Sequence, residues 1–251
     1  MCYGKNSERT RMEKFEINIL GCGSALPTTR HNPSSQVISI RDKWFMIDCG
    51  EGTQLQLRRS HIPFMRINHV LISHLHGDHC YGLPGMLSTW GLMKRQVPLH
   101  IYAHADLQQL LQPWLHYFCE KINYEVVFHS INPMDATCIY EDHSLSITTI
   151  PLRHRLPCCG FLFREKPTPR HIMREWTDFH QVPLCMFNRL KNGEDYTKPD
   201  GTVVPNECLT SPSTPVRSYA YCSDTAPFPP VIPIITGVDM LYHEATFAQS
   251  E

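Results

Sequence analysis

The pattern of apolar and polar residues along the chain predicts short strands interrupted by helices. Apolar side chains alternate through residues 15–19, which predicts a strand, and a glycine-rich turn follows it. The stretch SQVISIRDKWFMID, residues 35–48, holds two apolar runs separated by a polar turn at residues 41–43. This arrangement is typical of a hairpin, so the first part of the chain is predicted to be β structure.

The same periodicities predict the remaining core elements. A helix is expected over residues 78–93, with Pro84 tolerated near its first turn, and an apolar-faced helix over residues 105–118. A short helix is predicted over residues 53–62, and strands over residues 67–73, 98–104, 124–131, 143–152, 216–224 and 238–247. Strands dominate both halves and no repeat is visible. We therefore expect an α/β (α+β) fold with a two-sheet core and outer helices.

Residues 165–215 differ from the rest of the chain. They hold many of its prolines and show little strand or helix periodicity apart from LCMFNRLKN, residues 184–192. We expect a single domain, residues 1–251, carrying an inserted flexible arm at about 165–215 and no second core.

Composition limits the class of protein. The chain has 251 residues, of which 42% are hydrophobic and 19% charged, as in an ordinary globular protein. No apolar run reaches the ~20 residues of a membrane span, and the first residues lack the apolar core of a signal peptide. The 11 cysteines form no CxxC pair. We therefore expect reduced cysteines, no membrane contact and a cytoplasmic location.

Charge and histidine content narrow the chemistry. The net charge of −1 excludes a generic nucleic-acid binder, so any positive surface for RNA must be local. The unusual number is the 15 histidines, several of which gather in SHLHGDHCY, residues 73–81. This motif directly follows an apolar strand.

A strand that runs into a loop can direct several donors at one point. His74 and His76 are two positions apart and face the same way in extended backbone, while Asp78 and His79 fall where the chain turns. Imidazoles with carboxylates suit Zn²⁺, with Mn²⁺, Fe²⁺ or Co²⁺ as alternatives. A cluster of exposed loop histidines is the competing interpretation. The spacing favours a metal site.

Three further polar residues follow apolar strands. They are His154 in PLRHRLPCC, Asp224 in YAYCSDTA and His243 in MLYHEATF. Each one alone is weak evidence, since packed histidines and turn aspartates are common. Their shared position after a strand predicts that they meet the histidine motif at one edge of the sheets.

Together these motifs resemble a known family. SHLHGDH is similar to the signature of the metallo-β-lactamase fold, and GCGSALPTTRHNPSSQ, DCGEGTQLQLRR, HGDHCYGLPGML, CSDT and HEATF resemble ribonuclease Z, the tRNA 3′-processing endonuclease. The resemblance extends from about Phe15 to Phe247. It implies an αββα sandwich of two mixed sheets flanked by helices, with the site at one edge of both sheets.

The resemblance also implies a role for each motif residue. His74, His76 and His154 would bind one zinc ion, Asp78 and His79 a second, and Asp224 would bridge them. Asp78 would also orient or deprotonate the attacking water, and His243 would assist the leaving group. Glu244 beside it is expected either to orient His243 or to be a solvated charge.

Two departures from the family pattern are visible. The family carries another zinc-ligand histidine downstream of HEATF, and this chain ends at Glu251 before such a motif. We therefore expect the C-terminal family segment to be absent and the second metal to be one ligand short. In the arm, Pro183, Leu190 and Lys191 match the family, but Val182 stands where a glycine is usual.

Basic residues in the arm suggest a contact with RNA phosphates. They alternate with acidic residues, so charge alone leaves RNA binding and a solvated face equally open. Arg189 and Lys191 are the candidates for substrate binding there. Arg30 and Asn32 are expected at the lip of the active site, with a plain polar loop as the alternative. The basic residues are Arg164, Lys166, Arg170, Arg174, Arg189, Lys191 and Lys198.

The expected function is removal of the 3′ trailer from precursor tRNA by metal-dependent phosphodiester hydrolysis, leaving a 3′-hydroxyl on the tRNA. The resemblance further implies a homodimer. Two alternatives stay open: a small-molecule phosphodiesterase or other metal hydrolase of the same fold, and an RNA- or metal-binding protein without turnover.

Overall fold

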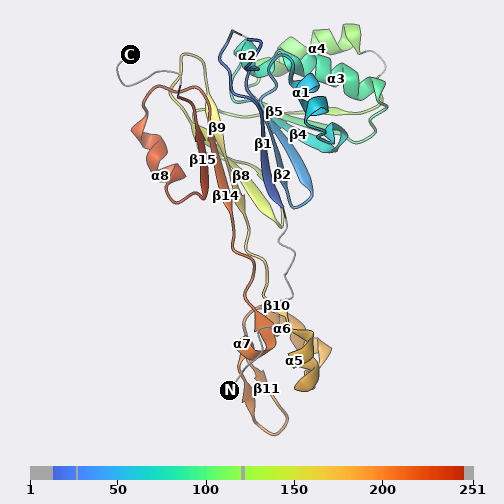
Figure 1. The fold of residues 1–251 in the computed structure, drawn as a ribbon, viewed down its shortest axis with the longest axis vertical. Coiled ribbons are helices and arrows are strands. Elements are labelled where there is room, and N and C mark those ends of the chain that lie inside the picture. Colours follow the sequence, from blue (N-terminus) through green and yellow to red (C-terminus); the bar gives the residue numbers. More distant parts are fainter. Residues whose placement is uncertain (1–13, 27, 120–121, 246–251) are drawn as a thin grey trace. The chain divides into compact units, whose positions relative to one another are not determined.

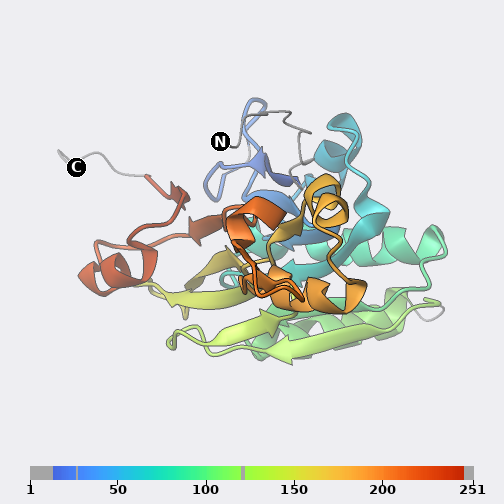
Figure 2. The same ribbon diagram turned by 90° about the horizontal axis from the view of Figure 1, so that it is seen from below.

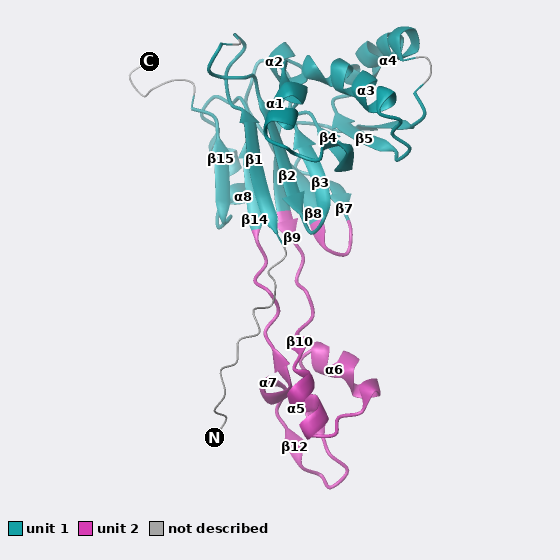
Figure 3. Cartoon of the chain, turned by 45° about the vertical axis from the view of Figure 1, so that its right-hand side comes forward, with its two compact units in different colours: residues 1–141, 146–163, 218–251 teal, residues 142–145, 164–217 magenta. Residues whose placement is uncertain are grey.

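The structure is a computed structural model and describes residues 14–26, 28–119 and 122–245. It divides into two compact units (Figure 3). Unit 1 comprises the described parts of residues 1–141, 146–163 and 218–251, and unit 2 comprises residues 142–145 and 164–217. The expected strand end at residues 246–247 lies outside the described residues.

Unit 1 contains a six-stranded mixed sheet in the order β1-β2-β3-β4-β5-β6 (Figure 1). Its strands are β1 (Phe15–Gly21), β2 (Ser35–Ile40), β3 (Lys43–Ile47), β4 (Ile67–Leu71), β5 (Leu99–Ala103) and β6 (Val126–Ser130). The first three strands pair antiparallel, and β3 to β6 pair parallel. The carboxyl ends of β3, β4 and β5 therefore meet at one edge of this sheet.

The second sheet has five strands in the order β15-β14-β9-β8-β7. They are β7 (Cys138–Glu141), β8 (Leu145–Pro151), β9 (Cys159–Glu165), β14 (Ser218–Cys222) and β15 (Met240–His243). The strands β7 and β8 pair antiparallel and β14 and β15 pair parallel. Strands β7 and β9 are not among the elements that the periodicity predicts.

Helices cover the outer face of each sheet. The helices α1 (Thr53–Arg59), α3 (Gly82–Leu92) and α4 (Asp106–Phe118) share one apolar cluster with the first sheet. The short segments η3 (Pro229–Val231) and α8 (Ile232–Ile235) share another with the second sheet. The inner faces meet through aromatic contacts such as Phe45 on Phe163, whose ring centroids are 5.5 Å apart. Figure 2 shows these layers end-on. The expected αββα sandwich is confirmed.

Two local predictions can be compared directly with the backbone. The hairpin of β2 and β3 is confirmed, and Arg41 and Asp42 both have positive φ, 46° and 63°, as a tight hairpin turn requires. The helical prediction over residues 78–93 is confirmed with one interruption, because the chain forms α2 (Gly77–Cys80) and then α3. The Gly82 amide donates to the Cys49 carbonyl at 2.8 Å instead of continuing the helical ladder.

Unit 2 has its own small core, so the expectation of an arm without one is wrong. The residues Val182, Leu190, Tyr196, Val204 and Leu209 form a buried apolar cluster. Short elements carry them, and two-residue strands pair as β10 with β13 and β11 with β12. They are β10 (His171–Ile172), α5 (Arg174–Phe179), η2 (Leu184–Met186), α6 (Phe187–Lys191), β11 (Tyr196–Thr197), β12 (Val203–Val204), α7 (Asn206–Leu209) and β13 (Thr210–Ser211).

The 3₁₀ segment η1 (Phe64–Arg66) precedes β4 and completes the list of elements. In the described part of the chain, no helix combines the length and the apolar character that a bilayer crossing needs.

Candidate metal centre

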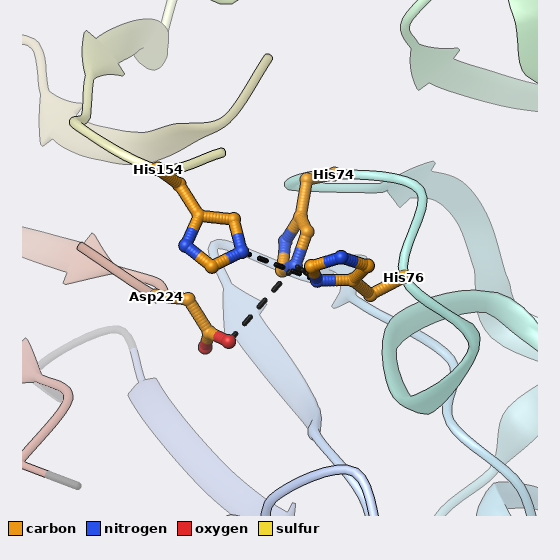
Figure 4. Close-up of side chains that lie close together, drawn as sticks. All are labelled: His74, His76, His154 and Asp224. Atoms are coloured by element: carbon orange, nitrogen blue, oxygen red, sulfur yellow. Dashed lines mark hydrogen bonds and ion pairs between the residues drawn. The ribbon is translucent and has the colours of Figure 1, made fainter. Parts of the chain in front are cut away.

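Four predicted ligands converge at the edge where the strands of unit 1 end. His74 and His76 follow β4, His154 follows β8, and Asp224 follows β14 (Figure 4). His76 Nδ1 lies 2.9 Å from His74 Nε2 and 3.2 Å from His154 Nε2, and Asp224 Oδ2 lies 4.0 Å from His74 Nε2. One donor atom from each side chain lies within 4.8 Å of the others.

The chemistry of this donor set fits a divalent metal ion. Ring nitrogens from His74, His76 and His154 point at the same place, which neutral imidazoles do when a cation or proton lies between them. Burial, with the charge of His79, lowers the pKa of His74 to about 3, so its ring is neutral and its lone pair is available. Three imidazoles and a carboxylate are a familiar zinc donor set.

Asp78 and His79 lie directly beside this cluster. His79 Nε2 is 3.5 Å from Asp78 Oδ2 and 3.5 Å from Asp224 Oδ1. Asp224 thus presents one oxygen toward His74 and the other toward His79, and the contact with His79 lowers the pKa of Asp224 to about 2. The geometry is that of a carboxylate between two groups of candidate ligands.

Asp48 was not among the predicted site residues, and it supports this arrangement by contacting His79. Asp48 is fully buried, and its carboxylate accepts hydrogen bonds from the Ser73 amide at 2.8 Å, the Tyr221 hydroxyl at 2.8 Å and His79 Nδ1 at 2.7 Å. Burial alone would raise the pKa of Asp48, but His79 and these hydrogen bonds bring it below its ordinary value. A signal was present, since Asp48 follows an apolar strand just as Asp224 does.

The effect on His79 is reciprocal. Burial alone would lower the pKa of His79, but the carboxylates of Asp48 and Asp224 raise it to about 10. Because Asp48 holds Nδ1, the Nε2 atom of His79 is directed toward Asp78 and Asp224. The ring orientation of His79 is therefore set before any metal binds.

An open cavity of about 1300 Å³ lies over these ligands. His76, Asp78, His154 and Asp224 line it, together with His243. The His243 Nδ1 atom donates to the Glu244 carbonyl at 2.7 Å, which leaves Nε2 as the nitrogen that can exchange a proton with a bound molecule. The Glu244 side chain accepts from the Thr225 amide at 3.0 Å and so holds the turn after Asp224.

Two arginines and a tyrosine in the cavity wall were not predicted. Arg153 and Arg155 flank His154, and Tyr81 follows α2. Arg155 Nε donates to His76 Nε2 at 3.0 Å, on the side of that ring away from His74 and His154. The sequence signal that could have identified these three residues is their position next to the predicted ligands.

The four candidates for substrate binding are not among the described residues that line this cavity. From the loop after β1, Ser24 and Ala25 line the cavity. Arg30 and Asn32 are not among the described lining residues. Arg189 and Lys191 belong to α6 of unit 2, where Arg189 Nε donates to Glu194 at 2.6 Å. Lys191 is exposed.

Comparison with known sequences places these features in a family. Residues 15–171 match the family model of the Anti-Pycsar protein Apyc1. The chain is 60% identical to Ribonuclease Z of Phocaeicola vulgatus over 240 residues, which covers 96% of this chain and 78% of that protein. It is 57% identical to Ribonuclease Z of Bacteroides fragilis, again over 96% of this chain, and 79% of that protein is covered.

Solved structures show the same fold at lower identity. Human tRNase Z, short form, superposes with a TM-score of 0.65 and 22% identity, covering 93% of this chain and 79% of that chain. The metallo-beta-lactamase fold protein YhfI from Bacillus subtilis gives a TM-score of 0.58 and 18% identity, covering 94% and 73%. These likenesses establish the metallo-β-lactamase fold. The sequence identity along 96% of the chain shows, beyond the fold, that this protein belongs to the ribonuclease Z family.

Proposed function

We propose that this protein is a metal-dependent endoribonuclease that removes the 3′ trailer from precursor tRNA and leaves a 3′-hydroxyl on the tRNA. One observation carries the proposal. A chain 60% identical to a ribonuclease Z brings His74, His76, His154 and Asp224 together at the edge of its two sheets. The open cavity above them can admit a polymer, because it is not a closed pocket for a small molecule.

We assign the metal ligands by their grouping. His74, His76 and His154 would hold one zinc ion, Asp78 and His79 would hold a second, and Asp224 would contact both. When bound, divalent ions in such a pair lower the pKa of water and neutralise charge that develops on a phosphodiester. Mn²⁺ suits the same nitrogen and oxygen donors.

The chain's own groups then account for both proton transfers. Asp78 lines the cavity beside the ligands, where its carboxylate can take a proton from the attacking water. As the water oxygen bonds to phosphorus, the bond from phosphorus to the tRNA 3′-oxygen breaks. His243, whose Nε2 remains available, donates a proton to that oxygen. The products are a tRNA 3′-hydroxyl and a trailer with a 5′-phosphate.

The first test is cleavage of an end-labelled precursor tRNA by the purified protein with added Zn²⁺ or Mn²⁺. We expect one metal-dependent cut at the start of the trailer, no cut with a chelator, and no cut by Asp78→Ala. Full activity of that variant would contradict the mechanism. Zinc content serves as a second readout, and it should fall in His154→Ala.

A small phosphodiester distinguishes the alternative substrate class. Bis(p-nitrophenyl) phosphate needs the metal centre but no RNA surface. Efficient hydrolysis of this compound without any cut in precursor tRNA would favour a small-molecule phosphodiesterase. No hydrolysis of either substrate by zinc-loaded protein would favour a binding protein without turnover.

We also propose a cytoplasmic homodimer, as the family resemblance implies. The location follows from the proposed substrate, which is produced where tRNA is transcribed. Light scattering on a gel-filtration peak tests the dimer, and the expected mass is twice the 29.0 kDa of one chain.

A further inference from the structure

Tyr81 is an exposed aromatic side chain held in a fixed place in the wall of the cavity. Its exposed fraction is 73%, and its hydroxyl makes no hydrogen bond with the described residues. The ring lies against Gly77, where a Cβ atom would collide with it. The absence of a side chain at Gly77 therefore leaves room for the ring, and the rest of the ring is exposed to solvent.

Isolated exposed aromatic residues are common on protein surfaces and need no special explanation. Tyr81 differs because it lines the same cavity as His76, Asp78 and His154. It is also three residues from Asp78, the proposed proton acceptor, in the turn that carries both. An aromatic face in the wall of this cavity can contact the part of a bound strand next to the bond that is cut.

The same cavity offers unpaired positive charge. Arg153 and Arg155 are exposed, line the cavity on either side of His154, and form no ion pair with a carboxylate in the described parts of the chain. Guanidinium groups bind phosphate oxygens through several donors at once. An aromatic face beside two guanidinium groups matches the alternation of base and phosphate in single-stranded RNA.

We propose that Tyr81 is a stacking platform for a nucleobase that adjoins the scissile phosphodiester, and that Arg153 and Arg155 bind the neighbouring phosphates. This inference rests on the proposed function and names how its site holds the strand. Stacking suits the task because every base has an aromatic face, so trailers of different sequence are accepted. The base is held by its shape and not by its hydrogen-bonding edge.

A double-mutant cycle tests the proposed stacking on Tyr81, with the protein variant as one change and the substrate as the other. Tyr81→Leu keeps apolar bulk over Gly77 and removes the aromatic face, whereas Tyr81→Phe keeps the face. Precursor tRNA is prepared with an abasic residue at either nucleotide flanking the cut. For the intact precursor we expect kcat/KM to fall about tenfold in the leucine variant and less than about threefold in the phenylalanine variant.

The coupling between the two changes decides the result. With one of the two abasic precursors, kcat/KM of the wild type should fall to the value that Tyr81→Leu shows with the intact precursor. The kcat/KM of Tyr81→Leu should be the same for that abasic precursor and the intact one. Equal losses for wild type and variant in both abasic precursors would overturn the platform, as would a tenfold loss in Tyr81→Phe at unchanged zinc content. If the wild type leaves the intact precursor uncut, the proposed function itself fails.

The salt dependence of cleavage tests the arginines. Arg153→Gln removes one phosphate contact, so the slope of log kcat/KM against log salt should become shallower by about 0.7. Arg153→Lys should keep the wild-type slope. Arg66→Gln is the matched control, because Arg66 precedes β4 at the edge of the sheet opposite the site. A slope unchanged in Arg153→Gln and Arg155→Gln would overturn the phosphate contacts.

Discussion

The carboxylate of Asp48 collects hydrogen bonds from the Ser73 amide, the His79 ring and the Tyr221 hydroxyl, which come from two segments of the chain far from Asp48 in sequence. Because Asp48 is buried, none of these donors can form a hydrogen bond with water in place of the carboxylate if it is removed. Asp48 itself has positive φ, 55°, a conformation that aspartate, asparagine and glycine adopt more easily than other residues. A single side chain thus fixes the ring of His79 and joins the two sheets.

Asp48→Ala should lower the free energy of unfolding of metal-free protein by about 3–5 kcal/mol, because it leaves a buried, charged partner uncompensated. Urea unfolding in the presence of a chelator measures this. Asp106→Ala, an exposed helix-terminal change, serves as the control and should cost less than about 1 kcal/mol. Similar values for the two variants would show that Asp48 does not position the site.

At the scale of elements, the register of the parallel strands brings three histidines side by side. His69 on β4 pairs with His100 on β5, and the His100 ring in turn stacks with His129 on β6 at 5.2 Å. His100 Nδ1 and His129 Nε2 are 2.9 Å apart, so one donates and the other accepts. This hydrogen bond requires that at least one of the two rings is neutral. The contact between β5 and β6 therefore depends on pH.

Burial and the neighbouring His100 lower the pKa of His129. The unfolded chain therefore takes up a proton as pH falls through about 6.5 while the folded chain resists it, and stability is lost on acidification. His129→Gln should reduce this loss between pH 7.5 and 5.5, measured as the shift in urea midpoint. His100 and Tyr102 face the ring, and His104 lies in the same small pocket. An unchanged shift would contradict the assignment.

Arg95 joins the segment after α3 to the start of β4. Its guanidinium donates to the carbonyls of Ile67 at 2.9 Å, Val97 at 2.7 Å and Pro98 at 3.0 Å, and its residue is only 2% exposed. Arg95→Met should cost about 3 kcal/mol in urea unfolding, because these buried carbonyls lose their donors.

Arg95→Lys should recover little of that stability, since one ammonium cannot reach all of these carbonyls as the planar fork does. The exposed neighbour Lys94→Met is the matched control. A loss below about 1 kcal/mol for Arg95→Met would show that water replaces the guanidinium.

At the scale of the whole molecule, the proposed metal ligands and the proposed RNA contacts belong to separate compact units. The site residues belong to unit 1, whereas Arg189 and Lys191 belong to unit 2, which has its own apolar cluster. Arg189 is partly neutralised by Glu194, while Lys191 forms no ion pair among the described residues. Lys191 therefore offers the more available charge.

Lys191→Ala should raise KM for precursor tRNA severalfold, with kcat and the hydrolysis of bis(p-nitrophenyl) phosphate unchanged, because the proposed contact of Lys191 is with an RNA phosphate and the small substrate has no such contact to lose. Lys94→Ala in unit 1 controls for a general loss of positive charge. An equal effect on both substrates would mean that the change disturbs the site and does not remove an RNA contact.

Sequence alone predicted the positions of the candidate ligands, because chemistry-bearing residues follow apolar strands at a spacing that short-range geometry explains. His74 and His76 share a face by the two-residue period of extended chain, and Asp224 and His243 mark other strand ends. The same alternation of strand and helix patterns predicted a two-sheet core with outer helices, and the family resemblance implied the αββα sandwich.

Only the tertiary structure decided which of these residues meet and what supports them. Asp48 contacts His79 across 31 positions and Tyr221 across 173, distances over which local periodicity carries no information. The break between α2 and α3 has the same origin, since the Gly82 amide bonds to Cys49 of a distant turn. The small core of unit 2 also depends on contacts between short segments that have no period of their own. Pairing across sequence is set by packing, and packing exists only in the folded chain.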